Sequence, residues 1–234
     1  MKLDILTALN TERAARRATI VVSNIATAQQ RLVKAAEITE DPLRAILAER
    51  LRSGKSGMVD SEEGRVFLTV HVPAAQLVAI GAVHISQALA PIAKLLGYDV
   101  TIVDPRTAFA SPERFPDVKI IAEWPDKALP SLGIDRYTAF VALTHDPKID
   151  DPALLYALAR DCFYIGALGS RKTHAKRGER LKGQGATDAD IARIHAPIGL
   201  AIGAVSPSEI AVAIMAEITA TLRLPKELAK ENAA

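Results

Sequence analysis

The strongest constraint on the fold comes from residues 76–106, whose pattern is that of a strand, a tight turn, a helix, a second strand and an acid. Residues 77–80 form a short apolar run without alternation, which is typical of a parallel strand buried on both faces. Apolar residues then recur at helical spacing over residues 84–96. The second strand ends at Asp104, where a βαβ nucleotide-binding unit places its ribose-binding acid. The stretch predicts a Rossmann-type unit.

The sequence after this unit keeps alternating between strand and helix patterns. Such alternation predicts an α/β fold, a Rossmann-like parallel sheet with helices on both faces. Asp151 is the expected N-cap of a helix whose first residue is Pro152. Further strands are expected at 118–121, 137–143 and 162–167, and further helices at 152–160, 171–181, 187–194 and 206–222.

The residues before the Rossmann-like region have a mixed pattern that predicts a small N-terminal α+β domain. Residues 31–34 fit either a hairpin partner of the preceding strand or a helix. Helices are expected at 3–15 and 42–52, and strands at 18–22 and 66–72. The junction is placed at residues 73–75, which gives domains of 1–73 and 74–234.

Composition excludes several classes of function. The formal net charge is only +2, which gives no electrostatic case for binding nucleic acid or an anionic membrane. No apolar run approaches the roughly 20 residues that span a bilayer, and the first residues do not resemble a secretory signal. The single cysteine, Cys162, excludes an internal disulfide and is expected to be a buried residue rather than a thiolate nucleophile. The predicted location is the cytoplasm.

The turn after the first Rossmann strand departs from the dinucleotide fingerprint. A Gly-x-Gly-x-x-Gly loop needs glycines at 81, 83 and 86, whereas the chain has Gly81, Val83 and Ser86. The middle glycine allows the pyrophosphate to approach the backbone, and the Val83 isopropyl group would occupy that space. The departure disfavours ordinary NAD binding.

Polar side chains follow each predicted strand at the edge where parallel sheets bind their ligands. Exposed backbone N–H groups at Gly169 and Ser170, aided by the dipole of the helix that follows, are expected to hold a phosphate or a similar anion. The candidate binding residues are Gly81, Val83, His84, Asp104, Arg106, Thr144, His145, Asp146, Gly169, Ser170 and Arg171.

Each of these groups also has a structural explanation. Either histidine, His84 or His145, can serve as a hydrogen-bonded residue at a strand end. Asp146, Asp150 and Asp151 fit turn and cap positions better than a metal site. Arg171, Lys172 and Arg177 also fit a solvated helix face. No metal site and no catalytic nucleophile is predicted.

Several motifs, taken in order, resemble the XdhC/CoxI family of accessory proteins, which assist maturation of molybdenum hydroxylases such as xanthine dehydrogenase and aerobic carbon monoxide dehydrogenase. The resemblance extends over about residues 73–222. The motifs lie at 81–84 (Gly-Ala-Val-His), 103–106 (Val-Asp-Pro-Arg), 109–116, 143–146 (Leu-Thr-His-Asp) with Asp150, 166–171 (Gly-Ala-Leu-Gly-Ser-Arg), 194–200 (Ile-His-Ala-Pro-Ile-Gly-Leu), 202–204 (Ile-Gly-Ala) and 207–211 (Pro-Ser-Glu-Ile-Ala).

The resemblance implies a non-catalytic chaperone. Such a protein would bind molybdenum cofactor (molybdopterin) transiently, present it to a cysteine desulfurase for sulfuration, and deliver it to the hydroxylase apo-enzyme. The pterin phosphate is expected near Gly169, Ser170 and Arg171, with His84, Asp104 and His145 toward the pterin or molybdenum end. The chain looks like a short form of the family, since residues 1–72 lack its Gly-Gly-Cys-Val-Glu segment.

Two other functions remain open. An NAD(P)-dependent oxidoreductase would use the Rossmann cleft and Asp104, and a pure interaction module would dock its partners with an empty cleft. The apolar stripe from Ile210 to Leu222 fits either core packing or the seam of a homodimer.

Overall fold

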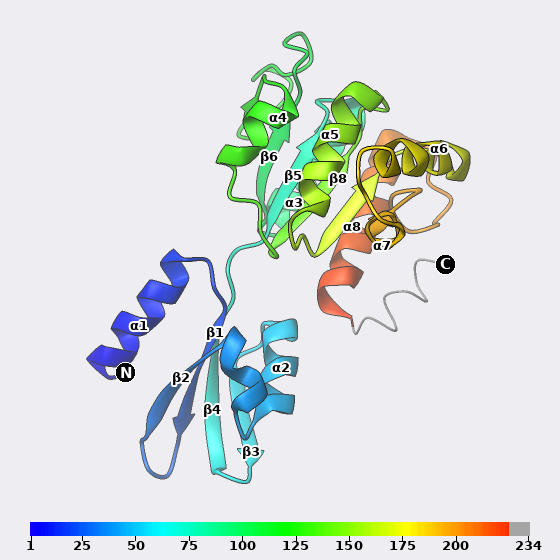
Figure 1. Cartoon of the computed structure of the whole chain (residues 1–234). Coiled ribbons are helices and arrows are strands. Elements are labelled where there is room, and N and C mark those ends of the chain that lie inside the picture. Colours follow the sequence, from blue (N-terminus) through cyan, green and yellow to red (C-terminus); the bar gives the residue numbers. More distant parts are fainter. Residues whose placement is uncertain (225–234) are drawn as a thin grey trace. The chain divides into compact units, whose positions relative to one another are not determined.

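The computed structural model describes residues 1–224. The chain divides into two compact units, with the division between Pro73 and Ala74 (Figure 1). Each unit has its own sheet and its own core. No helix among residues 1–224 combines the length and the apolar character needed to cross a bilayer.

The N-terminal unit is a four-stranded antiparallel sheet of order β2-β1-β4-β3. Residues 31–34 form the hairpin partner of the first strand, so the helical alternative for them is wrong. Strand β3 is missing from the sequence-based prediction, because it has only a weak apolar pattern. The elements are α1 (Leu3–Ala14), β1 (Thr19–Asn24), β2 (Gln30–Lys34), the 3-10 helix η1 (Ala35–Glu40), α2 (Arg44–Ser53), β3 (Gly57–Ser61) and β4 (Gly64–His71).

Strand β1 is central to this unit because both of its faces are covered. Ile20 and Val22 lie in a core cluster with Leu47 of α2, whereas Val21 on the opposite face clusters with Leu9 of α1. Alternate residues of a strand point to opposite faces, so one short β-branched run serves two helices.

The C-terminal unit is a six-stranded sheet of order β10-β9-β8-β5-β6-β7, in which all pairs are parallel. This confirms the predicted Rossmann-like sheet, and its strand order reverses between β5 and β8. The elements are β5 (Gln76–Ile80), α3 (His84–Leu95), β6 (Asp99–Val103), β7 (Lys119–Ile121), α4 (Pro125–Ala128), the 3-10 helix η2 (Leu129–Ser131), β8 (Thr138–Ala142), α5 (Pro147–Leu158), β9 (Tyr164–Ala167), α6 (Arg171–Lys182), α7 (Asp188–Ile191), β10 (Ile194–His195) and α8 (Pro207–Arg223).

Helices cover both faces of this sheet, as predicted. Leu77 of β5 belongs to a cluster with α3 and α8, and its neighbour Val78 belongs to a cluster with α4, α5 and α6. Ile214 and Ile218 of α8 are fully buried in the first cluster. The stripe on α8 is therefore core within this unit.

Two predicted boundaries in this unit are wrong. Helix α5 begins at Pro147 rather than at Pro152, and its N-cap is Asp146, whose side chain accepts from the Lys148 N–H. Both prolines follow an aspartate, so the local signal does not distinguish them. The helix expected to run to Ile194 ends at Ile191, because the backbone of Ile194 pairs with Ile165 as an edge strand.

Candidate functional site

The point of reversal between β5 and β8 brings two histidine-bearing turns together. Ile80 pairs with Ala142, so the turns that follow the two strands leave the sheet side by side. Gly81 has φ +112°, and a Cβ atom there would lie 2.8 Å from Cγ2 of Thr144. His84 and His145, carried by these turns, are both exposed. Both predicted histidines therefore lie at the carboxyl edge of the sheet, where Rossmann folds bind ligands.

Asp104 lies beneath this edge rather than on its surface. Its side chain is 0% exposed, and it accepts hydrogen bonds from the N–H of Ala82 at 2.8 Å and from the N–H of Arg106 at 2.9 Å. The Arg106 guanidinium adds two more, at 2.9 and 2.7 Å. Burial opposes ionisation, but these bonds hold the pKa of Asp104 below its usual value. The carboxylate anchors the turn and presents no free oxygen to a ribose.

A second buried carboxylate shapes the turn after β8. Asp150 is 1% exposed and accepts from the Thr144 hydroxyl at 2.7 Å and from the His145 N–H at 3.0 Å. Burial raises the pKa of Asp150, although the bonds from Thr144 oppose the rise. His145 has φ +63°, a conformation uncommon for a non-glycine residue. The Asp150 carboxylate thus holds a strained turn that points the imidazole outward.

The N-terminus of α6 leaves free donors next to this turn. Ser170 is the N-cap, and its hydroxyl accepts from the Thr173 N–H at 3.2 Å. The first N–H groups of a helix have no acceptor within the helix, and those of Arg171 and Lys172 have no acceptor elsewhere among residues 1–224. Neither of these positions carries an acid, and both carry cations. Gly169, with φ +132°, allows Thr173 to pack close to the chain.

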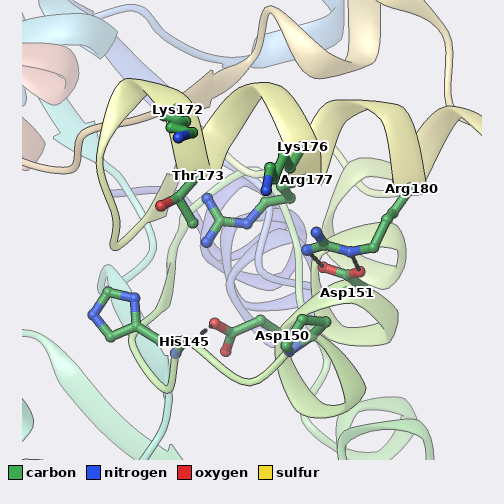
Figure 2. Close-up of a pocket in the computed structure, with 9 residues that line it drawn as sticks. His145, Asp150, Asp151, Lys172, Thr173, Lys176, Arg177 and Arg180 are labelled. Carbon is green, nitrogen blue, oxygen red and sulfur yellow. Dashed lines mark hydrogen bonds and ion pairs between the residues drawn. The ribbon is translucent and has the colours of Figure 1, made fainter.

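A cleft of about 180 Å³ lies between α5 and α6, and we call it the α5–α6 cleft (Figure 2). Asp151 accepts a bidentate pair from Arg180 at 2.6 and 3.0 Å, so it is an ion-pair partner rather than a cap. The cleft is lined by His145, Pro147, Asp150, Asp151, Lys172, Thr173, Lys176, Arg177 and Arg180.

Arg177 is the unexpected member of this cleft. It is only 2% exposed, which contradicts its expected place on a solvated helix face. Its Nη2 donates to the Leu168 carbonyl at 2.8 Å, while Nε and Nη1 have no partner among residues 1–224. Burial lowers the pKa of Arg177, with Asp150 and Asp151 opposing the shift. A sequence signal exists, since Arg177 lies one turn before Leu181 on a helix with no other large apolar residue.

The remaining predicted residues lie around the same edge. Val83 is the N-cap of α3, and its half-buried side chain packs on the core. Arg106 is half-buried and stacks over the exposed Phe109 ring at 4.6 Å. His145 lines the α5–α6 cleft together with the cations of α6. His84 follows Val83, the N-cap, as the first residue of α3.

A buried network between β9, β10 and α8 is a feature that sequence reasoning missed. Glu217, 4% exposed, accepts from the Tyr164 hydroxyl at 2.5 Å and the Gly199 N–H at 2.8 Å. Its other oxygen lies 2.9 Å from Nδ1 of His195, whose ring stacks on Tyr164. Burial opposes ionisation, but these partners keep the pKa of Glu217 low. The network holds the loop after β10 on α8.

Cys162 is buried, and burial raises its pKa to about 12. Within residues 1–224, no group of His, Cys, Asp and Glu side chains is arranged to hold a metal ion.

Comparison with protein-family models identifies the family of this chain. The model described as the XdhC Rossmann domain matches residues 77–218. The chain belongs to the XdhC family. The matched residues run from β5 into α8, so they include both histidine turns and the α5–α6 cleft.

Curated relatives agree with the assignment to XdhC. The chain is 36% identical to YqeB of Escherichia coli over 155 residues, and this alignment covers 65% of this chain and 28% of the relative. It is 31% identical over 150 residues to a probable xanthine dehydrogenase subunit of Bacillus subtilis, covering 64% and 43%. It is 32% identical over 155 residues to the molybdenum cofactor insertion chaperone PaoD of E. coli, covering 66% and 42%. The chain thus spans less than half of the length of each of these relatives.

A solved structure shares the fold. The crystal structure described as a xanthine dehydrogenase from Bacillus halodurans aligns with a TM-score of 0.66 at 22% identity. The alignment covers 96% of this XdhC-family chain and 65% of the other. At this identity the likeness supports the fold alone.

Proposed function

We propose that this chain is an accessory protein that binds molybdenum cofactor as cargo and assists its sulfuration and insertion into a molybdenum hydroxylase of the xanthine dehydrogenase or carbon monoxide dehydrogenase type. One observation carries the proposal. Two turns with exposed histidines lie side by side at the point of strand reversal, and the cationic N-terminus of α6 lies next to them. Family membership and the name of the relative PaoD support the same assignment.

The residues present fit the two ends of such a cargo. A phosphate ester needs N–H donors and cations, and α6 offers the backbone N–H groups of its first turn together with two donors of Arg177 that have no partner among residues 1–224. The pterin and molybdenum end needs donors and acceptors at the open edge, where His84 and His145 are exposed. The cofactor supplies the redox chemistry only in its final enzyme.

The roles of individual residues follow from this arrangement. His84 and His145 would contact the pterin or its metal end, and Asp104 would act from below by fixing the Ala82 turn. Arg106 shields this anchor and stacks on Phe109. None of these groups needs to form a covalent bond, so the protein would hold and release its cargo rather than transform it.

The partners would be a hydroxylase apo-enzyme and a cysteine desulfurase. Because the one cysteine of the chain is buried just before β9 and its thiol has a raised pKa, sulfur would be supplied by the desulfurase and not by this protein. We also propose that the chain forms a homodimer. Sedimentation of the purified chain measures its mass in solution and so tests this proposal.

Cofactor retention tests the proposal. Purified protein is mixed with molybdenum cofactor released from a molybdoenzyme, passed through a desalting column, and assayed by fluorescence of the oxidised pterin. We expect wild type to retain cofactor at micromolar concentration, and His84→Ala or His145→Ala to weaken binding about 10-fold, the effect of losing one hydrogen bond to a charged group.

His71→Ala is the matched control, since His71 lies in the N-terminal unit. It should bind as wild type does. If wild type retains no cofactor at micromolar concentration, the proposal is wrong. Activation of a hydroxylase apo-enzyme, with and without the desulfurase, then measures insertion and sulfuration separately.

A further inference from the structure

We propose that the α5–α6 cleft is a binding site for a phosphate group, with the buried Arg177 as its anchoring donor and Lys172 and Lys176 at its rim. The natural ligand would be the phosphate monoester end of the molybdenum cofactor, and this identification rests on the proposed function. The site differs from the one expected from the sequence, which centres on Gly169, Ser170 and Arg171.

The first support is the state of Arg177. A buried guanidinium destabilises the folded protein unless its donors are paired. Only the bond from Nη2 to the Leu168 carbonyl is made, and Nε and Nη1 are left without partners among residues 1–224. Figure 2 shows the guanidinium pointing from α6 toward the space above His145 and Asp150. An oxyanion in that space would accept from the free donors.

The second support is the distribution of charge. Lys172 and Lys176 line the cleft, are exposed, and have no carboxylate within ion-pairing distance in the described part of the chain. Arg180, by contrast, is paired with Asp151. Asp150 already accepts donors from Thr144 and His145. Lys172 and Lys176 therefore bring uncompensated positive charge to the rim of the cleft, whereas the carboxylates of the cleft, Asp150 and Asp151, already have donors of their own.

The third support is the placement of these cations on α6. The N-terminus of a helix carries a partial positive charge, so the cationic side chains of Arg171 and Lys172 in the first turn are unfavourably placed. No acid is present in that turn to compensate. A dianion bound in the cleft would reduce this unfavourable interaction.

The cleft has room for such a group. Its volume is about 180 Å³, whereas a water molecule occupies about 30 Å³ in the liquid. A tetrahedral oxyanion fits with part of its first hydration shell. The bulk of a larger ligand would extend toward His145, which lines the same cleft.

Equilibrium dialysis of the full chain with radiolabelled inorganic phosphate at constant ionic strength tests the site. We expect saturable binding by wild type. Arg177→Met should weaken it about 30-fold, since the variant loses the hydrogen bonds from a charged donor to the anion. The double variant Lys172→Gln, Lys176→Gln changes exposed residues only and should weaken it about 5-fold without loss of thermal stability.

Lys127→Gln on α4 is the control for charge, because it removes an exposed lysine from another helix. It should bind phosphate within about 2-fold of wild type. If phosphate binding is absent in wild type, or is equal in wild type and in both cleft variants, the inference is overturned. If Arg177→Met lowers thermal stability while the lysine variant binds phosphate as wild type does, Arg177 has a purely structural role and the inference is overturned.

The outcome is separable from that of the proposed function. Cofactor retention is measured independently, and it can persist when phosphate binding fails, which overturns this site alone. Conversely, phosphate binding that depends on Arg177 still supports the site if cofactor is not retained. If the protein both retains cofactor and binds phosphate through Arg177, inorganic phosphate should compete with the cofactor.

Discussion

Asp104 accepts a 2.8 Å hydrogen bond from the backbone N–H of Ala82, and this contact ties the end of β6 to the turn that carries His84. The same carboxylate is fully buried and accepts three further bonds from Arg106. The position of an exposed histidine therefore depends on an acid that does not itself reach the surface.

Replacing this acid should destabilise the Rossmann unit. In Asp104→Asn, one oxygen becomes an amide donor, so the Arg106 guanidinium loses an acceptor and so does the backbone N–H of either Ala82 or Arg106. We expect the free energy of unfolding to fall by about 2–4 kcal/mol, measured by urea denaturation. Asp99→Asn is the control, because Asp99 is exposed at the start of the same strand. Equal effects of the two variants would contradict the anchoring role.

The contribution of Asp104 should depend on pH with a defined sign. Its pKa is lowered in the folded protein, so its stabilisation is present above the unfolded pKa of about 3.9 and is lost as the pH falls through the lower folded value. The difference in unfolding free energy between wild type and Asp104→Asn should stay constant from pH 7 to pH 5 and shrink below about pH 4. Urea titrations at several pH values measure it. A difference that grows on acidification would contradict the assigned shift.

The close approach of the two turns predicts a specific effect at Gly81. Gly81→Ala places a Cβ atom 2.8 Å from Cγ2 of Thr144 at a position with φ +112°. Gly97→Ala meets nothing within 4 Å, although its φ is +82°. Both variants bear the backbone strain of about 1–2 kcal/mol, and only Gly81→Ala adds overpacking of about 1–3 kcal/mol.

Thermal or urea unfolding measures this difference, and cofactor retention should weaken in Gly81→Ala alone, because the His84 and His145 turns would be pushed apart. If the two alanine variants are equally stable, the two turns are not in contact as described.

Cys162 should be chemically inert in the folded state. With a pKa of about 12, its thiolate fraction at pH 8 is about one in ten thousand, and the side chain is buried. Labelling by a thiol reagent should be slow in buffer and complete in urea. Rapid labelling of the native protein would show that the thiol is accessible and ionised, and it would reopen a role for this residue in sulfur transfer.

The oxidoreductase alternative predicts nicotinamide binding, and we expect none. The Asp104 carboxylate is committed to Ala82 and Arg106, and Val83 occupies the place of the middle glycine of the fingerprint. Titration with NADH should leave the fluorescence of the nucleotide unchanged for wild type and for Val83→Gly. Tight binding by either protein would restore the alternative.

The sequence was sufficient for the architecture of the C-terminal unit. The short apolar runs at 77–80 and 100–103 are typical of strands buried on both faces, and the helical repeat between them requires a parallel crossover. Two Asp-Pro pairs, one before α5 and one inside it, carry the same local signal, so the predicted helix start at Pro152 is wrong. Tertiary contacts of Asp150 with the Thr144 turn are consistent with the earlier start.

The sequence by itself determined which residues stand at the ends of the parallel strands, because short unbroken apolar runs joined by helical patterns are typical of buried parallel strands. It therefore predicted that His84 and His145 would share one edge. Only the tertiary structure decided which polar groups are buried, since burial depends on what packs against each helix face. That packing turned Asp104 from a surface acid into an anchor beneath the turn, and it turned Arg177 from an apparently solvated cation into a buried donor without a full set of partners among residues 1–224.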